Sequence, residues 1–127
     1  MVASEHFSEH ELKCSCGCNR SDMDEEFLEL LEDLRVWYGK PMILSSGFRC
    51  PAYNNHVSGT GYSGPHTTGQ AVDVLIHGVD VLCFLKGALK LGFSGIGVNQ
   101  KGRLGGRFIH LDNLSEPDFP RPRLWTY

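Results

Sequence analysis

The stretch Ser63-Gly-Pro-His-Thr-Thr-Gly-Gln-Ala-Val-Asp-Val-Leu-Ile76 joins a loop directly to an apolar run. Residues 58–69 are mainly Gly, Ser, Thr and Tyr, a composition typical of loops. Residues 71–76 have the length and apolar content of a buried strand, and only Asp73 interrupts them. A buried carboxylate is costly unless it is paired or bound to a cation. This stretch therefore predicts both a strand in the core and a site built on that strand.

The elements around this strand follow from apolar periodicity and from Gly and Pro stop signals. Their order predicts an α+β fold: a small, mostly antiparallel sheet flanked by helices, in one domain over residues 1–127. The expected helices are a short one capped by Ser8 with Glu11, one over 24–38, one or two turns over 51–57, and one over 81–91 capped by Asp80. The other expected strands cover 42–46, 94–99 and 107–111, and the tail 113–127 is expected to be extended and anchored by Trp125.

Composition narrows the classes of function. The chain of 127 residues has a formal charge of -3, so we expect no basic surface that binds nucleic acid. It has no run of eighteen apolar residues, so no membrane insertion is expected. The start, Met1-Val-Ala-Ser-Glu-His-Phe7, has neither a basic beginning nor an apolar stretch, so no secretory signal is expected. A monomer is the default expectation.

Five cysteines are present, and three of them crowd together as Cys14-Ser-Cys16-Gly-Cys18. This spacing is tighter than in the usual C-x-x-C zinc knuckle. Three interpretations stay open for these three cysteines together with Cys50. They are a second zinc site, a disulfide to Cys50, and plain buried or free thiols.

Three residues have types that do not suit their positions. Asp73 and His110 each stand inside an apolar strand, and His66 closes the loop seven residues before Asp73. Each has an ordinary explanation, since such histidines are often solvated or hydrogen-bonded in a core, and Asp73 could pair with Arg49 or Arg107. One cation would satisfy all three groups at once. Two imidazoles and a carboxylate form a three-ligand zinc site with its fourth position open to water, the catalytic arrangement.

Three sequence patterns carry a family resemblance. They are S-G-x-R in Ser45-Ser-Gly-Phe-Arg-Cys-Pro51, followed by Asn54; S-x-x-H-x-x-G-x-A-x-D in Ser63–Asp73; and H-x-D in Phe108-Ile-His-Leu-Asp112. Together they resemble the M15 peptidases, which are zinc D-alanyl-D-alanine carboxypeptidases and their phage-lysin relatives. The Cys-rich start and the late Trp resemble the short, stand-alone members. The Hedgehog signalling domain shares the zinc-site architecture, but the S-G-x-R segment favours the peptidases.

The resemblance implies a role for each matching residue. His66, Asp73 and His110 match the ligands of one catalytic zinc ion. Arg49 matches the arginine that reads a substrate carboxylate, a role that suits a bidentate guanidinium group. Ser63 matches a serine expected to hold substrate or ligand by hydrogen bonds.

The implied reaction is hydrolysis of a peptide bond in peptidoglycan stem peptides. Zinc would polarise the scissile carbonyl and lower the pKa of its bound water, and a general base would move the proton. Some members carry an acid three residues before the last ligand, where this chain has Arg107, and others a His two before it, where Phe108 stands. Asp112 is the best local substitute, because it shares a strand face with His110, about 6.5 Å along. It is expected either to receive the proton or to orient His110.

The most specific expectation is therefore a D-Ala-D-Ala carboxypeptidase. The alternatives are a peptidoglycan endopeptidase of the phage-endolysin type and a zinc-containing wall-binding module without catalysis. A disulfide-framed binding domain without metal is a further reading. The place of action would be the cell wall, with phage-type release from the cytoplasm as one route.

Overall fold

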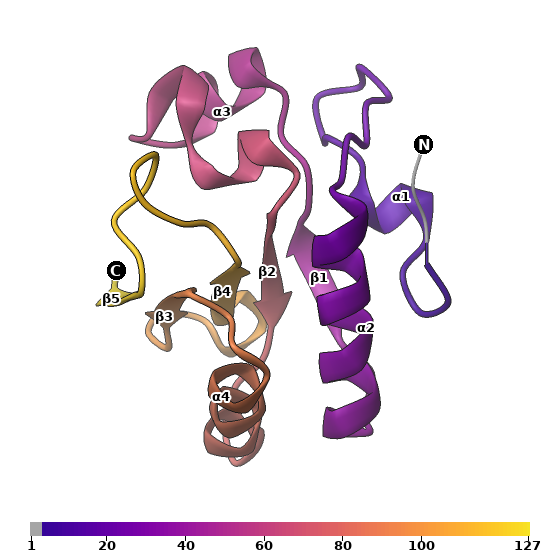
Figure 1. Ribbon diagram of the computed structural model, residues 1–127, viewed down its shortest axis with the longest axis vertical. Helices are drawn as coiled ribbons and strands as arrows, with labels where there is room; N and C mark the ends of the chain where they lie inside the picture. The colour runs from indigo at the N-terminus through magenta and orange to yellow at the C-terminus, as the bar shows by residue number, and fades with distance from the viewer. Residues whose placement is uncertain (1–3) are drawn as a thin grey trace.

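The computed structural model describes residues 4–127 (Figure 1). The expectation of no secretory signal rests on residues 1–7, and residues 1–3 lie outside this described part. Within residues 4–127, no helix combines the length and the apolar character needed to cross a membrane.

Five strands form one sheet in the order β1-β2-β4-β3-β5. All pairs are antiparallel except β3 with β5, which is parallel. This confirms the predicted α+β class with a mostly antiparallel sheet. The strands are β1 (Ile43–Ser46), β2 (Ala71–Leu75), β3 (Gly95–Asn99), β4 (Phe108–Asp112) and β5 (Arg123–Thr126).

The register of the central pair, β2 and β4, places the unusual residues together. Asp73 lies directly opposite His110 in the antiparallel ladder. Alternate residues of a strand point to opposite faces, so Asp73 and His110 share one face while their apolar neighbours point to the other. Those neighbours, Val72, Val74, Ile109 and Leu111, are buried in the hydrophobic core.

Two long helices supply a further part of that core. Helix α2 (Glu25–Tyr38) contributes Phe27, Leu31 and Leu34, and α4 (Asp80–Leu91) contributes Phe84 and Ala88. The Asp24 side chain caps α2 by accepting a hydrogen bond from the Phe27 N–H at 2.9 Å. The two helices and the sheet enclose one core, so the functional face is the other side of the sheet.

Short helices cover the functional face. These are α3 (Pro51–Val57) and the 3-10 turns η1 (Gly61–Ser63) and η2 (Pro65–Thr68); α1 (Glu9–Leu12) and η3 (Leu104–Gly106) lie elsewhere. Figure 1 shows α3 and the neighbouring turns at one end of the molecule and α4 at the other. The predicted capping box of α1 is confirmed, with the Ser8 side chain accepting from the Glu11 N–H.

Two local expectations need correction. Asp80 does not cap α4, because the helix begins at Asp80 itself and Val79 takes the cap position without a side-chain bond. The Asp80 carboxylate instead accepts from Lys40 Nζ at 2.6 Å. The tail is extended only in part, because residues 116–118 form a turn in which the Phe119 N–H donates to the Ser115 carbonyl at 3.1 Å. Beyond the turn, Arg123–Thr126 forms β5, which pairs in parallel with β3. That pairing brings the end of the chain over the functional face.

Candidate metal centre

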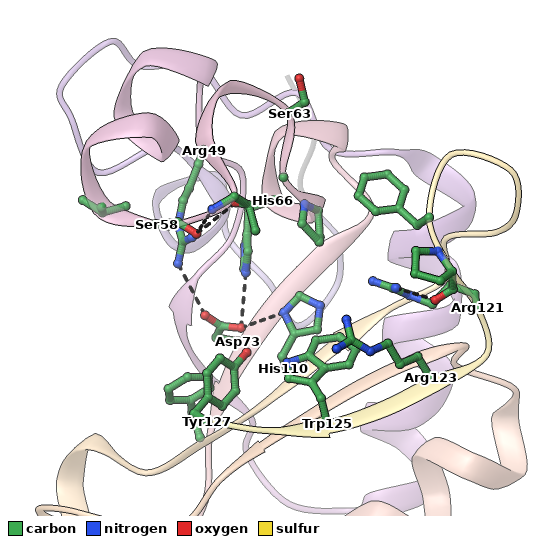
Figure 2. Close-up of a pocket in the computed structure, with 17 residues that line it drawn as sticks. Arg49, Ser58, Ser63, His66, Asp73, His110, Arg121, Arg123, Trp125 and Tyr127 are labelled. Atoms are coloured by element: carbon green, nitrogen blue, oxygen red, sulfur yellow. Dashed lines mark hydrogen bonds and ion pairs between the residues drawn. The ribbon is translucent and has the colours of Figure 1, made fainter.

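Three side chains from three segments converge on the functional face. His66 comes from η2, Asp73 from β2 and His110 from β4, and all three are buried. Asp73 Oδ1 lies 3.2 Å from His66 Nε2 and 3.1 Å from His110 Nδ1. One ligand atom from each residue lies within 4.8 Å of the other two. Figure 2 shows both rings pointing toward the carboxylate.

Each imidazole has a partner for its outer nitrogen. His66 Nδ1 lies 2.8 Å from the Gly47 carbonyl oxygen, which can only accept, so this nitrogen donates. His110 Nε2 lies 2.7 Å from Asp112 Oδ2. A histidine that binds a metal characteristically donates its other N–H to a carbonyl or carboxylate, which fixes the tautomer. In that tautomer the inner nitrogens, His66 Nε2 and His110 Nδ1, would offer their lone pairs to a metal ion bound beside Asp73.

The electrostatics of the centre favour a charged carboxylate. Burial raises the pKa of Asp73, but the charges and hydrogen bonds of His66 and His110 outweigh it and hold that pKa well below its usual range. Burial lowers the pKa of His110, but the hydrogen bonds that Asp112 and Asp73 accept from the ring outweigh it and raise that pKa. Two oriented imidazoles and one carboxylate form a donor set that fits zinc with three protein ligands and an open fourth position.

Asp112 is enclosed on every side. It has no exposed surface, and Arg121 donates to both of its oxygens, from Nε to Oδ1 at 2.9 Å and from Nη2 to Oδ2 at 2.7 Å. The Leu114 N–H also donates to Oδ1, at 3.3 Å. Burial raises the pKa of Asp112, yet the bonds from Arg121 and His110 lower it to about 2. The carboxylate thus sits behind His110, and the cavity described below does not reach it.

Arg49 lies on the opposite side of the centre. Its Nη2 is 3.5 Å from Asp73 Oδ2. Its Nε donates to Ser46 Oγ at 3.1 Å and its Nη1 to Asn54 Oδ1 at 3.2 Å. Asn54 is fully buried and donates to Thr60 Oγ1 and to the Gly61 carbonyl, so it ties the arginine to the loop before His66. The guanidinium group is therefore held in place beside the candidate ligands.

A cavity of about 590 Å³ opens onto these residues. The three predicted ligands and Arg49 lie in its wall. Ser63 also lines it but is exposed, and Figure 2 shows its hydroxyl pointing away from the three ligands. Among the described residues that line the cavity, Asp73 is the only one with an acidic side chain.

Sequence reasoning missed part of this wall. The C-terminal segment contributes Arg121, Arg123 and Tyr127 to the cavity. Trp125, expected only to anchor the tail, lies against His110 with 5.1 Å between the ring centroids. Tyr127 and Trp125 appear beside Asp73 and His110 in Figure 2. No motif marks these residues, since the parallel pairing of β5 with β3 and the contact of Arg121 with Asp112 bring this segment to the site.

Comparison with known proteins adds one finding. The sequence profile of the family described as Peptidase M15 matches residues 5–112 of the 127, a range that includes all three candidate ligands, Arg49 and Asp112. No significant match was found among curated proteins or among solved structures.

Proposed function

Because the chain belongs to the peptidase M15 family, we propose that it is a zinc-dependent D,D-carboxypeptidase that removes the terminal D-alanine of peptidoglycan stem peptides. Family membership implies a metallopeptidase that acts on peptidoglycan. The finer assignment, to the last peptide bond, rests on the position of Arg49 relative to the candidate ligands.

The observation that carries the proposal is the 3.5 Å between Arg49 Nη2 and Asp73 Oδ2. A guanidinium group binds a carboxylate in a bidentate manner. One residue spans at most about 3.6 Å, so a terminal carboxylate held at Arg49 brings the last peptide bond next to the metal ligands. An enzyme that cut further from the chain end would need its carboxylate-binding group further from the metal ligands.

His66, Asp73 and His110 would hold the zinc ion. When bound, zinc polarises the scissile carbonyl and lowers the pKa of a bound water. The remaining residues bind and orient. Arg49, fixed by Ser46 and Asn54, holds the terminal carboxylate.

We assign Asp112 to orienting His110 and not to direct proton transfer. Its two oxygens already accept from Arg121, Leu114 and the His110 ring, and the side chain is fully buried. A general base must reach the proton that it removes directly or through one water. The location of Asp112 behind the ring supports the positioning role.

An endopeptidase is the second candidate. The cavity continues past the ligands to a wall with Arg121, Arg123 and Trp125, and its volume of about 590 Å³ exceeds what one alanine fills. Such a cleft has room for a longer stem peptide. The wall-binding module without catalysis remains the third alternative, since Arg107 and Phe108 stand where some members have a base.

Mass spectrometry of purified muropeptides separates these functions. The carboxypeptidase releases free D-alanine from pentapeptide stems and leaves crosslinks intact, whereas an endopeptidase cuts crosslinked dimers. Activity should disappear with a chelator, return with zinc, and be absent in His66→Ala. Binding of wall fragments by zinc-loaded protein without any cleavage would establish the non-catalytic module instead.

A further inference from the structure

Four cysteines gather on the N-terminal side of the molecule, away from the candidate metal centre. The Sγ atoms of Cys14, Cys16, Cys18 and Cys50 all lie within 4.8 Å of one another. All four are free thiols. Cys50 is distant in sequence, so folding brings it to the three that stand close together.

The spacing of the sulfurs suits one metal ion. Zinc holds a thiolate at about 2.3 Å, and a tetrahedral arrangement then separates the sulfurs by about 3.8 Å. The distance from Cys16 Sγ is 3.5 Å to Cys14 Sγ and 3.7 Å to Cys50 Sγ. A disulfide would need about 2.05 Å between two sulfurs. The cluster therefore leaves room for an ion at its centre.

The backbone around the sulfurs forms a closed turn. The Cys14 N–H donates to the Arg20 carbonyl at 2.7 Å, which closes a loop over residues 14–20. Within it, Gly17 and the non-glycine Asn19 have left-handed φ values of 94° and 61°. The Cys50 N–H donates to Cys14 Sγ at 3.3 Å. This loop has no helix or strand of its own, and Cys16 and Cys18 are exposed, so apolar burial does not explain its shape.

We propose that these four cysteines form a second zinc site with a closed tetrathiolate shell, and that this site is structural. Four protein ligands leave no position for water or substrate, which distinguishes structural from catalytic zinc. This inference does not depend on the proposed peptidase activity.

The site would connect the N-terminal segment to the wall of the candidate metal centre. Cys50 directly follows Arg49, and the Phe48 N–H donates to the Leu12 carbonyl at 2.9 Å. The carbonyl of Gly47, which precedes Phe48, accepts a hydrogen bond from the His66 ring. A metal bound by Cys14 and Cys50 thus fixes the segment that orients both His66 and Arg49.

Zinc stoichiometry tests the proposal on the full chain, purified in reductant with added zinc. The wild type should hold two zinc ions, His66→Ala one and Cys18→Ser one. Cys83→Ser is the matched control, because Cys83 is an exposed free cysteine on α4 outside the cluster, and it should hold two. Cys18 is chosen because it is exposed, so its replacement by Ser leaves the core intact. One zinc in the wild type and none in His66→Ala would overturn the proposal.

Cobalt substitution provides a second measurement that needs no activity. Cobalt-loaded wild type and His66→Ala should show the thiolate-to-cobalt charge-transfer band of a tetrahedral sulfur site, and Cys18→Ser should lose most of it. Alkylation followed by mass spectrometry should find the exposed Cys16 and Cys18 protected by zinc and reactive after chelation, whereas the exposed Cys83 reacts in both states. A disulfide within the cluster in the reductant-purified protein, or thiols that react equally with and without zinc, would contradict the site.

Discussion

Asp112 Oδ2 lies 2.7 Å from His110 Nε2, on the edge of the ring opposite the nitrogen that faces Asp73. The two residues are separated by one position on β4, so they share a face of the sheet. The carboxylate therefore contacts the imidazole from behind, where it fixes the tautomer. A side chain in this position can act on the candidate metal centre only through His110.

Asp112→Asn should weaken zinc binding at the His66–Asp73–His110 centre by about 10- to 100-fold, the usual cost of losing such a supporting partner. The amide is a weaker acceptor for the ring N–H, so the tautomer of His110 is less well fixed. Zinc affinity is measured by competition with a chelator, and turnover at saturating zinc. Asp118→Asn, at an exposed aspartate, should leave both unchanged. Unchanged zinc affinity with turnover reduced by two orders would instead identify Asp112 as the general base.

Arg121→Gln should destabilise the fold by about 3–5 kcal/mol, because it breaks a buried ion pair and leaves Asp112 short of partners. The side chains of Arg121 and Asp112 are only 4% and 0% exposed, so the small values typical of surface pairs do not apply. Urea unfolding at neutral pH measures the effect. Arg103→Gln, at an exposed arginine in the loop before β4, should change stability by less than about 0.5 kcal/mol. Equal stability of the two variants would show that the pair contributes little.

The same pair predicts a pH dependence. The pKa of Asp112 is about 2 in the folded protein, below the usual value of about 3.9 in unfolded chains. A carboxyl whose pKa is lowered by folding stabilises the protein above the unfolded pKa, and this contribution is lost as the pH falls toward the folded pKa. The stability difference between wild type and Arg121→Gln should therefore be constant from pH 7 to about 5 and shrink below about 4. A difference that grows in acid would contradict the assignment.

Local sequence patterns predicted most of the fold and the three candidate ligands. The apolar pattern predicted the strands that carry Asp73 and His110. These two residues and His66 were predicted to form one site because a single cation would satisfy all three, and their ligand atoms do lie close together. The ion pair of Arg121 with Asp112 could not be predicted in this way. It depends on how a proline-containing loop returns the chain to the sheet, which no local propensity encodes. The parallel pairing of β5 with β3 is non-local for the same reason.

Arg49→Ala should mainly impair substrates that end in a free carboxylate, with a higher KM and a much smaller effect on amidated peptides. The guanidinium group lies 3.5 Å from Asp73 and is held by Ser46 and Asn54. Arg49→Lys should restore little, since an ammonium group does not reproduce bidentate binding. Kinetics on paired free and amidated stem peptides measure the effect. Unchanged KM for the free-carboxylate peptide would remove Arg49 from the substrate site.

Gly97→Ala should displace the C-terminal strand from the metal centre. Gly97 pairs with Trp125 between β3 and β5, and a Cβ at this position would lie 2.5 Å from the indole Nε1. The indole lies against His110, so it cannot move without disturbing the wall of the cavity. We expect the free energy of unfolding to fall by about 1–3 kcal/mol, the usual cost of overpacking. We also expect a change in Trp125 fluorescence, measured in a Trp37→Phe background. Gly105→Ala is the matched control, because a Cβ there has no atom within 4 Å, and it should change neither quantity. Equal effects of the two substitutions would mean that the packing of Trp125 over His110 does not constrain Gly97.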